Sequence, residues 1–204
     1  MYLVPNTLNI KRVFHAFSRL VTLYNGATRP IQPTEKAARL ITHVIQMEAI
    51  VNLLLVQHGQ AKNEAEDPTR SLNAVGVDSA EKVAKWLSMS GVEVTEIRHS
   101  GKRRAEQTAL IFAKHFSPRK GVTEAPGLNP MDDVYRVADE IREYPGSLML
   151  VGHLPFMTRL TGLLLAGNPE LQVVRFQNAG VVCLREDEGR WSVEWTVVPS
   201  LVNE

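Results

Sequence analysis

Residues 53–61 read LLLVQHGQA, an apolar run that ends abruptly at a polar corner containing glycine. A continuous apolar run of strand length is typical of a β-strand covered on both faces, as in a parallel sheet. The sequence therefore predicts a buried strand over residues 50–56. This strand delivers a glutamine and a histidine, Gln57 and His58, to the point where it ends.

Helix and strand patterns alternate along the rest of the chain. The sequence predicts helices over residues 73–90, 103–116 and 132–144 and from Pro155 to about 166, the first with an apolar stripe of Val75, Ala80, Val83, Ala84 and Leu87. It predicts strands over residues 92–99, 122–124, 147–151, 173–184 and 191–198, the last two joined by the turn-like Asp187-Glu188-Gly189. This order predicts a three-layer α/β/α sandwich with a mostly parallel sheet and an antiparallel edge hairpin.

Composition divides the chain into two parts of different charge. The 204 residues, 44% of them hydrophobic, are enough for one substantial core. The net charge is +1, so the total suggests neither nucleic acid nor a membrane as a partner. However, residues 1–46 carry six basic side chains and one acid, whereas the rest carries 17 basic and 21 acidic side chains, a net charge of −4. We expect a basic N-terminal extension over 1–46 and a single domain over 47–204.

Residues 9–24 of this extension have the pattern of a basic amphipathic helix. The apolar positions are too interrupted to span a bilayer, and no secretory signal is present. Three interpretations remain open: an organelle-targeting leader, a helix that docks on the body or on a partner, and translated upstream sequence with the true start at Met47. We favour the last, because Met47 lies just before the first strong strand.

The single cysteine, Cys183, excludes an intramolecular disulfide framework within this sequence and indicates a reducing compartment. We expect a cytoplasmic protein in which Cys183 is a small buried hydrophobic residue.

Several polar residues follow the predicted parallel strands directly. His58 follows the first strand, Ser100 and the pair Arg103-Arg104 follow the second, and His153 follows the fourth. Ligands of such sheets bind beyond the carboxyl ends of the strands, so these side chains are expected to meet at one edge. A lone histidine at a strand end is more often structural, and it is the convergence that suggests a site.

Phosphoryl transfer is the chemistry that fits this set. A neutral imidazole can attack phosphorus, and arginine offers forked donors to the phosphoryl oxygens. A helix N-terminus at Gly59 or Arg103 would add N–H donors. Neither His58 nor His153 belongs to a metal-ligand motif such as HExxH, and no phosphate-binding P-loop is present. We therefore expect no metal and no cofactor.

These motifs resemble those of the histidine phosphatase superfamily, also called phosphoglycerate mutase-like, and within it the small phosphohistidine phosphatases of the SixA group. The resemblance covers residues 52–201. Four ordered segments carry it: LLLVQHGQA, EDPTRSLNAVG (66–76), HSGKRRAEQT (99–108) and VGHLP (151–155). It implies a phosphoglycerate mutase-like fold, His58 as the nucleophile that becomes phosphorylated, Arg104 as the phosphate-binding arginine and His153 as the second catalytic histidine.

The chain departs from this family at Gln57, where the family has arginine. A glutamine side chain donates hydrogen bonds to phosphate but brings no charge. Arg70, Lys62 or Arg103 are candidates to restore the charge. The alternative is a catalytically silent module that binds phosphate or a phosphoprotein. The nearby pair Arg98-His99 lacks the glycine that follows His58, so we interpret His99 as a structural residue at a strand end.

The general acid is less evident, and Asp67 and Asp132 are the nearest candidates by motif position, although both also fit solvated loop carboxylates. The gaps between elements are too short for an inserted helical lid. An open site and an imidazole leaving group, which needs little help from an acid, both favour phosphohistidine as the substrate. The expected partner is a phosphorylated protein, for example a histidine phosphotransfer domain, or a small phosphate compound. Mutase activity is not expected.

Overall fold

The computed structural model describes residues 52–202, so the basic N-terminal segment and the start of the predicted first strand lie outside the described part. Within that range a six-stranded sheet has the order β3-β2-β4-β1-β5-β6. The strands are β1 (Asn52–Gln57), β2 (Glu96–His99), β3 (Val122–Glu124), β4 (Leu148–Gly152), β5 (Val181–Asp187) and β6 (Arg190–Val197). The helices are α3 (Ala74–Met89), α4 (Arg103–Phe116), α5 (Val134–Arg142), α6 (Phe156–Ala166) and the 3-10 helix η1 (Pro199–Leu201).

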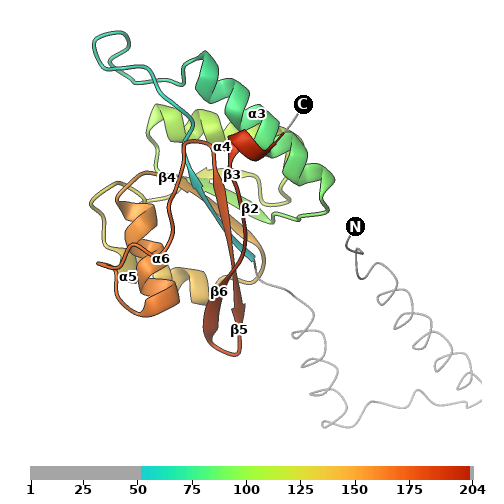
Figure 1. Ribbon diagram of the computed structural model, residues 1–204, viewed down its shortest axis with the longest axis vertical. Helices are drawn as coiled ribbons and strands as arrows, with labels where there is room; N and C mark the ends of the chain where they lie inside the picture. The colour runs from blue at the N-terminus through green and yellow to red at the C-terminus, as the bar shows by residue number, and fades with distance from the viewer. Residues whose placement is uncertain (1–51, 203–204) are drawn as a thin grey trace, which may run out of the picture. The chain divides into compact units, whose positions relative to one another are not determined.

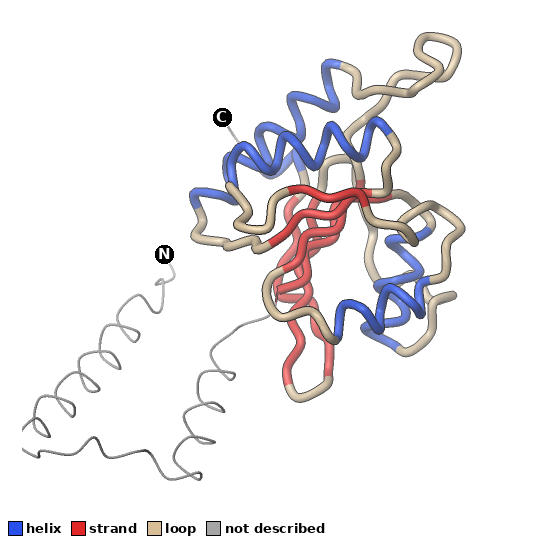
Figure 2. The backbone as a smooth tube through the Cα atoms, turned by 180° about the vertical axis from the view of Figure 1, so that it is seen from behind, coloured by secondary structure: helices blue, strands red, loops and turns tan. Residues whose placement is uncertain are grey.

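Helices cover both faces of this sheet. The strands β3, β2, β4 and β1 are parallel, whereas β5 runs antiparallel to β1 and β6 antiparallel to β5. The pair α3 and α4 lies on one face, and the pair α5 and α6 lies on the other (Figures 1 and 2). The predicted three-layer sandwich with an antiparallel edge hairpin is confirmed. No helix among residues 52–202 is long and apolar enough to span a membrane.

The side chains of strand β1 belong to two separate hydrophobic cores, one on each side of the sheet. Leu54 and Val56 belong to the core beneath α3 and α4, and Leu53 and Leu55 belong to the core beneath α5 and α6. All four side chains are at most 1% exposed. This alternation follows from the period of two along a strand. It explains why the four residues of β1 between Asn52 and Gln57 are all apolar.

Helix α3 begins where the sequence predicts, with one correction to its buried face. The Asn73 side chain caps the helix by accepting a hydrogen bond of 2.8 Å from the backbone N–H of Gly76. The predicted stripe is wrong at Val75, which is 60% exposed. One helical turn back from Ala80 falls at Gly76, so Gly76 rather than Val75 faces the core.

Gly76 and Gly59 allow α3 to cross the end of β1 at close range. A Cβ atom at Gly59 would lie 2.7 Å from the carbonyl oxygen of Gly76, and one at Gly76 would collide with the backbone of Gln60. The glycine that follows the histidine in the opening motif is therefore required by backbone packing.

Two predicted strands are longer than the observed ones. The strand predicted over 92–99 is β2, which begins only at Glu96. The strand predicted over 173–184 is β5, which begins at Val181. Residues 173–180 instead form an irregular segment that passes the end of β1, where the Ala179 N–H donates to the Gln57 carbonyl at 2.9 Å. The strand was predicted there partly because of Phe176, an apolar residue whose side chain is buried although it lies in a loop.

The remaining elements match closely. Helix α4 and strand β3 have the predicted bounds, and α5 is shorter than predicted because the Asp133 side chain caps it. Glu188 and Gly189 form the tip of the β5–β6 hairpin with φ of 50° and 79°, as a two-residue type I′ turn requires. Cys183 is fully buried, as expected, and burial raises the pKa of its thiol to about 12.

Candidate active site

The sheet brings the two predicted catalytic histidines together. Strand β4 lies between β1 and β2, so the carboxyl ends of these three strands are adjacent. His58 follows β1, and its backbone N–H donates a hydrogen bond of 3.1 Å to the carbonyl of Gly152. Gly152 is the residue directly before His153. The two imidazole rings lie with their centroids 4.8 Å apart and tilted by 56°. The predicted convergence at this edge is confirmed.

Hydrogen bonds fix the tautomer of His58. Its Nδ1 lies 2.7 Å from the carbonyl oxygen of Gly59, and because a carbonyl only accepts, Nδ1 carries the proton. Nε2 therefore presents a lone pair, to which Arg104 Nε donates at 3.1 Å. Burial, together with the positive charges of Arg104 and Arg70, lowers the pKa of His58 to about 4. The ring is neutral and nucleophilic at neutral pH.

His153 is a second neutral imidazole, held by a serine. Its Nε2 lies 2.6 Å from Ser100 Oγ. When the hydroxyl donates this bond, the ring proton resides on Nδ1, which is buried and has no partner in residues 52–202. Burial, His58 and Arg104 lower the pKa of His153 to about 3. The ring is thus neutral at neutral pH, and in this tautomer its Nδ1–H is free to donate a hydrogen bond.

Arg104 is held in place by the first turn of α4. Thr108 Oγ1 donates to the Arg104 carbonyl at 2.7 Å and accepts from the Gly59 N–H at 3.0 Å. Thr108 therefore ties the arginine motif to the histidine motif. Of the two predicted helix N-termini, the one at Arg103 is confirmed. The one at Gly59 is wrong, because Gly59 leads into a loop and the next helix begins only at Ala74.

Gln57 has an unusual environment for a polar side chain. Its Oε1 atom is buried and has no hydrogen-bond partner in the described part of the chain. A buried polar atom without a partner costs free energy, and such atoms are rare in folded proteins. Together with Nδ1 of His153, Gln57 supplies an unsatisfied polar group beside His58.

The loop 58–73, which projects from the body in Figure 1, presents Arg70. Asp67 organises the tip of this loop: its carboxylate accepts hydrogen bonds from the backbone and hydroxyl groups of both Thr69 and Ser71. Its carbonyl accepts a further bond of 2.8 Å from the Arg70 N–H. Arg70 has a left-handed φ of 52°, and its charge lowers the pKa of His58 and Arg104.

The other candidate cations and acids have different surroundings. The Arg103 guanidinium is exposed and pairs with Glu106 at 2.9 Å, which leaves Arg70 as the cation that acts on His58 besides Arg104. The hydrogen bonds from Ser71 and Thr69 hold the pKa of Asp67 far below its usual range, so it is ionised and has no proton to give. Asp132 accepts from the Asn129 N–H at 2.8 Å. Neither carboxyl group is arranged as a general acid.

His99 ends β2, as predicted for a structural residue. It is 7% exposed, and its Nδ1 accepts a hydrogen bond of 3.1 Å from the Gly101 N–H. Within residues 52–202 no three His, Cys, Asp or Glu side chains are grouped so as to hold a metal ion.

Sequence reasoning missed one residue that supports the site and did not give roles to two others. Asn178 Nδ2 donates to the His58 carbonyl at 2.8 Å. It lies 120 residues away in the segment mistaken for strand, so no local pattern points to it. Ser100 and Thr108 lie inside the arginine motif, and only the tertiary structure reveals their contacts with His153 and Gly59.

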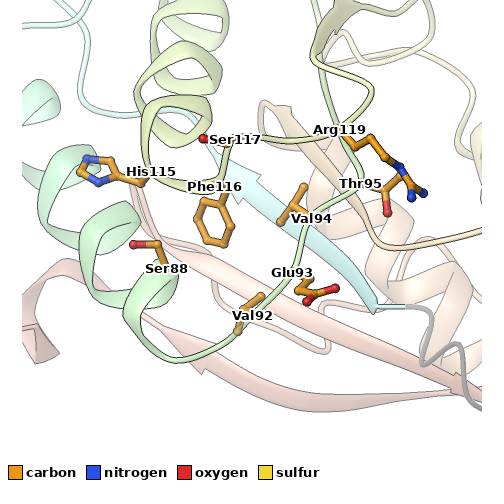
Figure 3. Close-up of a pocket in the computed structure, with 9 residues that line it drawn as sticks. All are labelled: Ser88, Val92, Glu93, Val94, Thr95, His115, Phe116, Ser117 and Arg119. Atoms are coloured by element: carbon orange, nitrogen blue, oxygen red, sulfur yellow. The ribbon is translucent and has the colours of Figure 1, made fainter. Parts of the chain in front are cut away.

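A separate pocket of about 360 Å³ lies away from these residues (Figure 3). It is lined by Val92–Thr95, which precede β2, and by His115, Phe116 and Ser117 at the end of α4. The histidine cluster, in contrast, follows β2 and precedes α4. The pocket is therefore at the opposite ends of these two elements from the candidate active site.

Comparisons with known proteins agree with this geometry. The model of the histidine phosphatase superfamily (branch 1) matches residues 53–133. The phosphohistidine phosphatase SixA of Escherichia coli (strain K12) is 26% identical over 155 residues, which are 73% of this chain and 94% of that protein.

Solved structures give the same result for the fold. A structure of the protein histidine phosphatase SixA complexed with tungstate has a TM-score of 0.66 and 25% identity, covering 74% of this chain and 99% of that one. A phosphoserine phosphatase from Entamoeba histolytica has a TM-score of 0.56 at 15% identity, covering 72% of this chain and 96% of that one. The fold is phosphoglycerate mutase-like, as predicted, and the chain is similar to the SixA-like phosphatases of the histidine phosphatase superfamily.

Proposed function

We propose that this phosphatase hydrolyses phosphohistidine through a covalent phosphohistidine on its own His58. The observation that carries the proposal is the state of the His58 ring. The Gly59 carbonyl holds the proton on Nδ1, and the pKa is lowered to about 4, so Nε2 offers a lone pair at neutral pH. A nucleophile that is already deprotonated needs no general base.

In the first step Nε2 of His58 attacks phosphorus, the bond from phosphorus to the substrate nitrogen breaks, and the substrate ring, protonated on its other nitrogen, leaves as neutral imidazole. The Arg104 Nε–H, which donates to Nε2 in the free site, is close enough to transfer its hydrogen bond to a phosphoryl oxygen. The Nδ1 atom of His153, buried and without a partner in the described chain, can donate to a phosphoryl oxygen when it carries the ring proton, and the Gln57 side chain can donate through its amide N–H groups. Arg70 adds positive charge from the loop.

Bonding to phosphorus makes the His58 ring cationic, because Nδ1 keeps its proton. The Gly59 carbonyl accepts that proton's hydrogen bond and so favours the charged ring, in line with its effect of raising the His58 pKa. Water then attacks phosphorus, and Nε2 of His58 leaves as the neutral imidazole. No carboxylic acid is needed when the leaving group is an imidazole, which agrees with the ionised state of Asp67.

Trapping the intermediate tests this proposal. After brief incubation with a labelled phosphohistidine substrate, the protein should carry phosphate that is lost in acid and retained in alkali. His58→Ala should abolish both the label and turnover. His115→Gln, at the far end of α4, should keep both. If His58→Ala retained full turnover, the mechanism would be wrong.

The substrate class follows from the open surroundings of the site. Between residues 52 and 202 no helix is inserted between β1 and α3 or between β4 and α6 that would enclose a metabolite. A phosphoryl group carried on a protein surface suits such a site better than a small sugar phosphate. Comparing a phosphorylated histidine phosphotransfer domain with small phosphate esters tests this preference. A large preference for one small metabolite would overturn it.

A further inference from the structure

A groove of about 500 Å³ opens beside His58, between the start of α3 and the segment 173–180. Its lining includes Gln60, Val75, Arg175, Gln177 and Asn178, and we call it the α3 groove. The mechanism uses none of these side chains.

The α3 groove is lined by residues that are bonded to, or close in sequence to, His58. Asn178 donates through Nδ2 to the His58 carbonyl at 2.8 Å, and Gln60 stands two residues after His58. The Gln60 carbonyl also accepts a hydrogen bond of 3.0 Å from the Asn73 N–H at the start of α3. The groove therefore lies next to the backbone that carries the proposed nucleophile.

The residues that line the groove are suited to binding polar and acidic side chains of another molecule. Three side-chain amides both donate and accept, and Val75 is 60% exposed among them. Arg175 is exposed and forms no hydrogen bond or ion pair within the described residues. Besides burial, His58 and Arg104, the positive charges of Lys102 and Arg70 also lower the pKa of His153. The rim of the site is thus basic although residues 47–204 carry a net charge of −4.

We infer that the α3 groove docks the protein that carries the phosphohistidine, by binding acidic and polar side chains that surround its phosphorylated residue. This inference rests on the proposed function and adds a partner surface to it. The catalytic cluster contacts only the phosphoryl group and the adjacent ring. The carrier is then distinguished from a free phosphorylated amino acid by contacts made outside that cluster, chiefly with Arg175 and Val75.

Charge-reversal variants separate docking from chemistry. The probes are a histidine phosphotransfer domain phosphorylated on its histidine and free phosphohistidine. Arg175→Glu and Val75→Glu should each lower kcat/KM for the phosphorylated domain roughly tenfold, mainly through KM. For free phosphohistidine they should change it by less than about twofold, since neither residue touches the reacting atoms. A glutamate at position 75 lies in the first turn of α3, where a negative charge favours the helix.

Arg119→Glu, an equally exposed reversal in the distant pocket of Figure 3, is the matched control and should leave both substrates unaffected. Raising the salt concentration should weaken hydrolysis of the phosphorylated domain by the wild type more than by Arg175→Glu. If both groove variants affected the two substrates equally, or neither substrate, docking in the α3 groove would be excluded while the proposed function stood. A wild type that hydrolysed neither substrate would overturn the proposed function, and this inference with it.

Discussion

Arg104 Nε lies 3.1 Å from His58 Nε2 and donates a hydrogen bond to the same lone pair that is proposed to attack phosphorus. The free site thus holds the proposed nucleophile and the proposed phosphate ligand in contact with each other. An incoming phosphoryl group has to take over the arginine's hydrogen bond before Nε2 is free to react. Arg104 is therefore expected to act in the chemical step and not only in binding.

Comparing variants of Arg104 with a variant of its neighbour Arg103 tests this expectation. Arg104→Ala should lower kcat/KM for free phosphohistidine by about 10²–10³, the usual effect of losing one donor to the transition state. Arg104→Lys should recover only part of the lost kcat/KM, because lysine keeps the positive charge but lacks the paired N–H donors of the guanidinium group. Arg103→Ala is the control: Arg103 is exposed and pairs with Glu106, so its loss should have little effect. Equal effects at the two positions would contradict the assignment.

The pH profile should reflect the lowered pKa of His58. Free imidazole loses its lone pair to a proton as pH falls through 6.5, whereas His58 does so near pH 4. We consider an acid-stable phosphate ester as the substrate. The part of the pH dependence of kcat/KM that is due to protonation of His58 should be flat from pH 7 to about 5, and kcat/KM should fall only below that pH. A fall centred near pH 6.5 would show that the ring is not desolvated in the free enzyme.

The same shift links pH to folding. The unfolded chain binds protons at His58 below pH 6.5, while the folded chain does so only near pH 4. Between these values the unfolded state holds more protons, so this group's contribution to stability is complete above pH 6.5 and is lost as pH falls toward 4. His153, with a pKa lowered to about 3, acts in the same direction.

The sequence predicts this site because its reactive residues lie directly after strands, where a buried apolar run gives way to polar residues. His58, His153 and the pair Arg103-Arg104 were found in that way, and the family resemblance singled out Arg104. The order of the strands brings these segments together. Asn178 was not found, because its bond to the His58 carbonyl spans 120 residues and its segment resembles a strand. The exposure of Val75 was missed because an apolar side chain in the first turn of α3 continues the apolar pattern, although Gly76 occupies the buried position.

Of the two interpretations that the sequence left open for Asp67, a general acid and a loop carboxylate, the structure favours the loop carboxylate. An aspartate followed at two and four residues by Thr69 and Ser71 has the spacing of a side chain that binds its own loop. The structure shows a carboxylate that accepts hydrogen bonds from both residues and shapes the loop that carries Arg70.

Asp67→Asn should therefore act through Arg70. The amide keeps the side chain's size but cannot accept all the hydrogen bonds from Thr69 and Ser71, so the loop should hold Arg70 less well. We expect KM for free phosphohistidine to rise a few-fold with little change in kcat. Arg70→Ala should have a similar effect, and the double variant should be no worse than Arg70→Ala alone. Glu66→Gln, next to Asp67 and exposed, is the control. Additive losses would show that Asp67 acts independently of Arg70.

Gly76→Ala should destabilise the fold, although Gly76 takes no part in the proposed reaction. A Cβ at this position collides with the Gln60 backbone, so α3 or the end of β1 must move. Overpacking of this kind costs about 1–3 kcal/mol, measurable by urea unfolding. Val77→Ala, at a 40% exposed position one residue further on, should change stability by only about 0.5 kcal/mol. Equal stability of both variants would contradict the close crossing of the two segments.

Gln57→Arg is the sharpest test of the residue that sets this chain apart from its relatives. The Gln57 Oε1 atom is buried without a partner, and its amide brings no charge to the phosphoryl group. An arginine here should raise kcat/KM for free phosphohistidine by roughly 10–100-fold, since charge-assisted hydrogen bonds are about twice as strong as neutral ones. In the absence of substrate, its buried charge should lower stability, and inorganic phosphate should restore the loss. Gln57→Leu should instead lower the rate, because the amide's hydrogen bonds to phosphate are lost. Gln60→Arg, an exposed change three residues away, controls for the added charge. If Gln57→Arg and Gln57→Leu both left the rate of the wild type unchanged, the side chain at position 57 would not contact the phosphoryl group in the transition state.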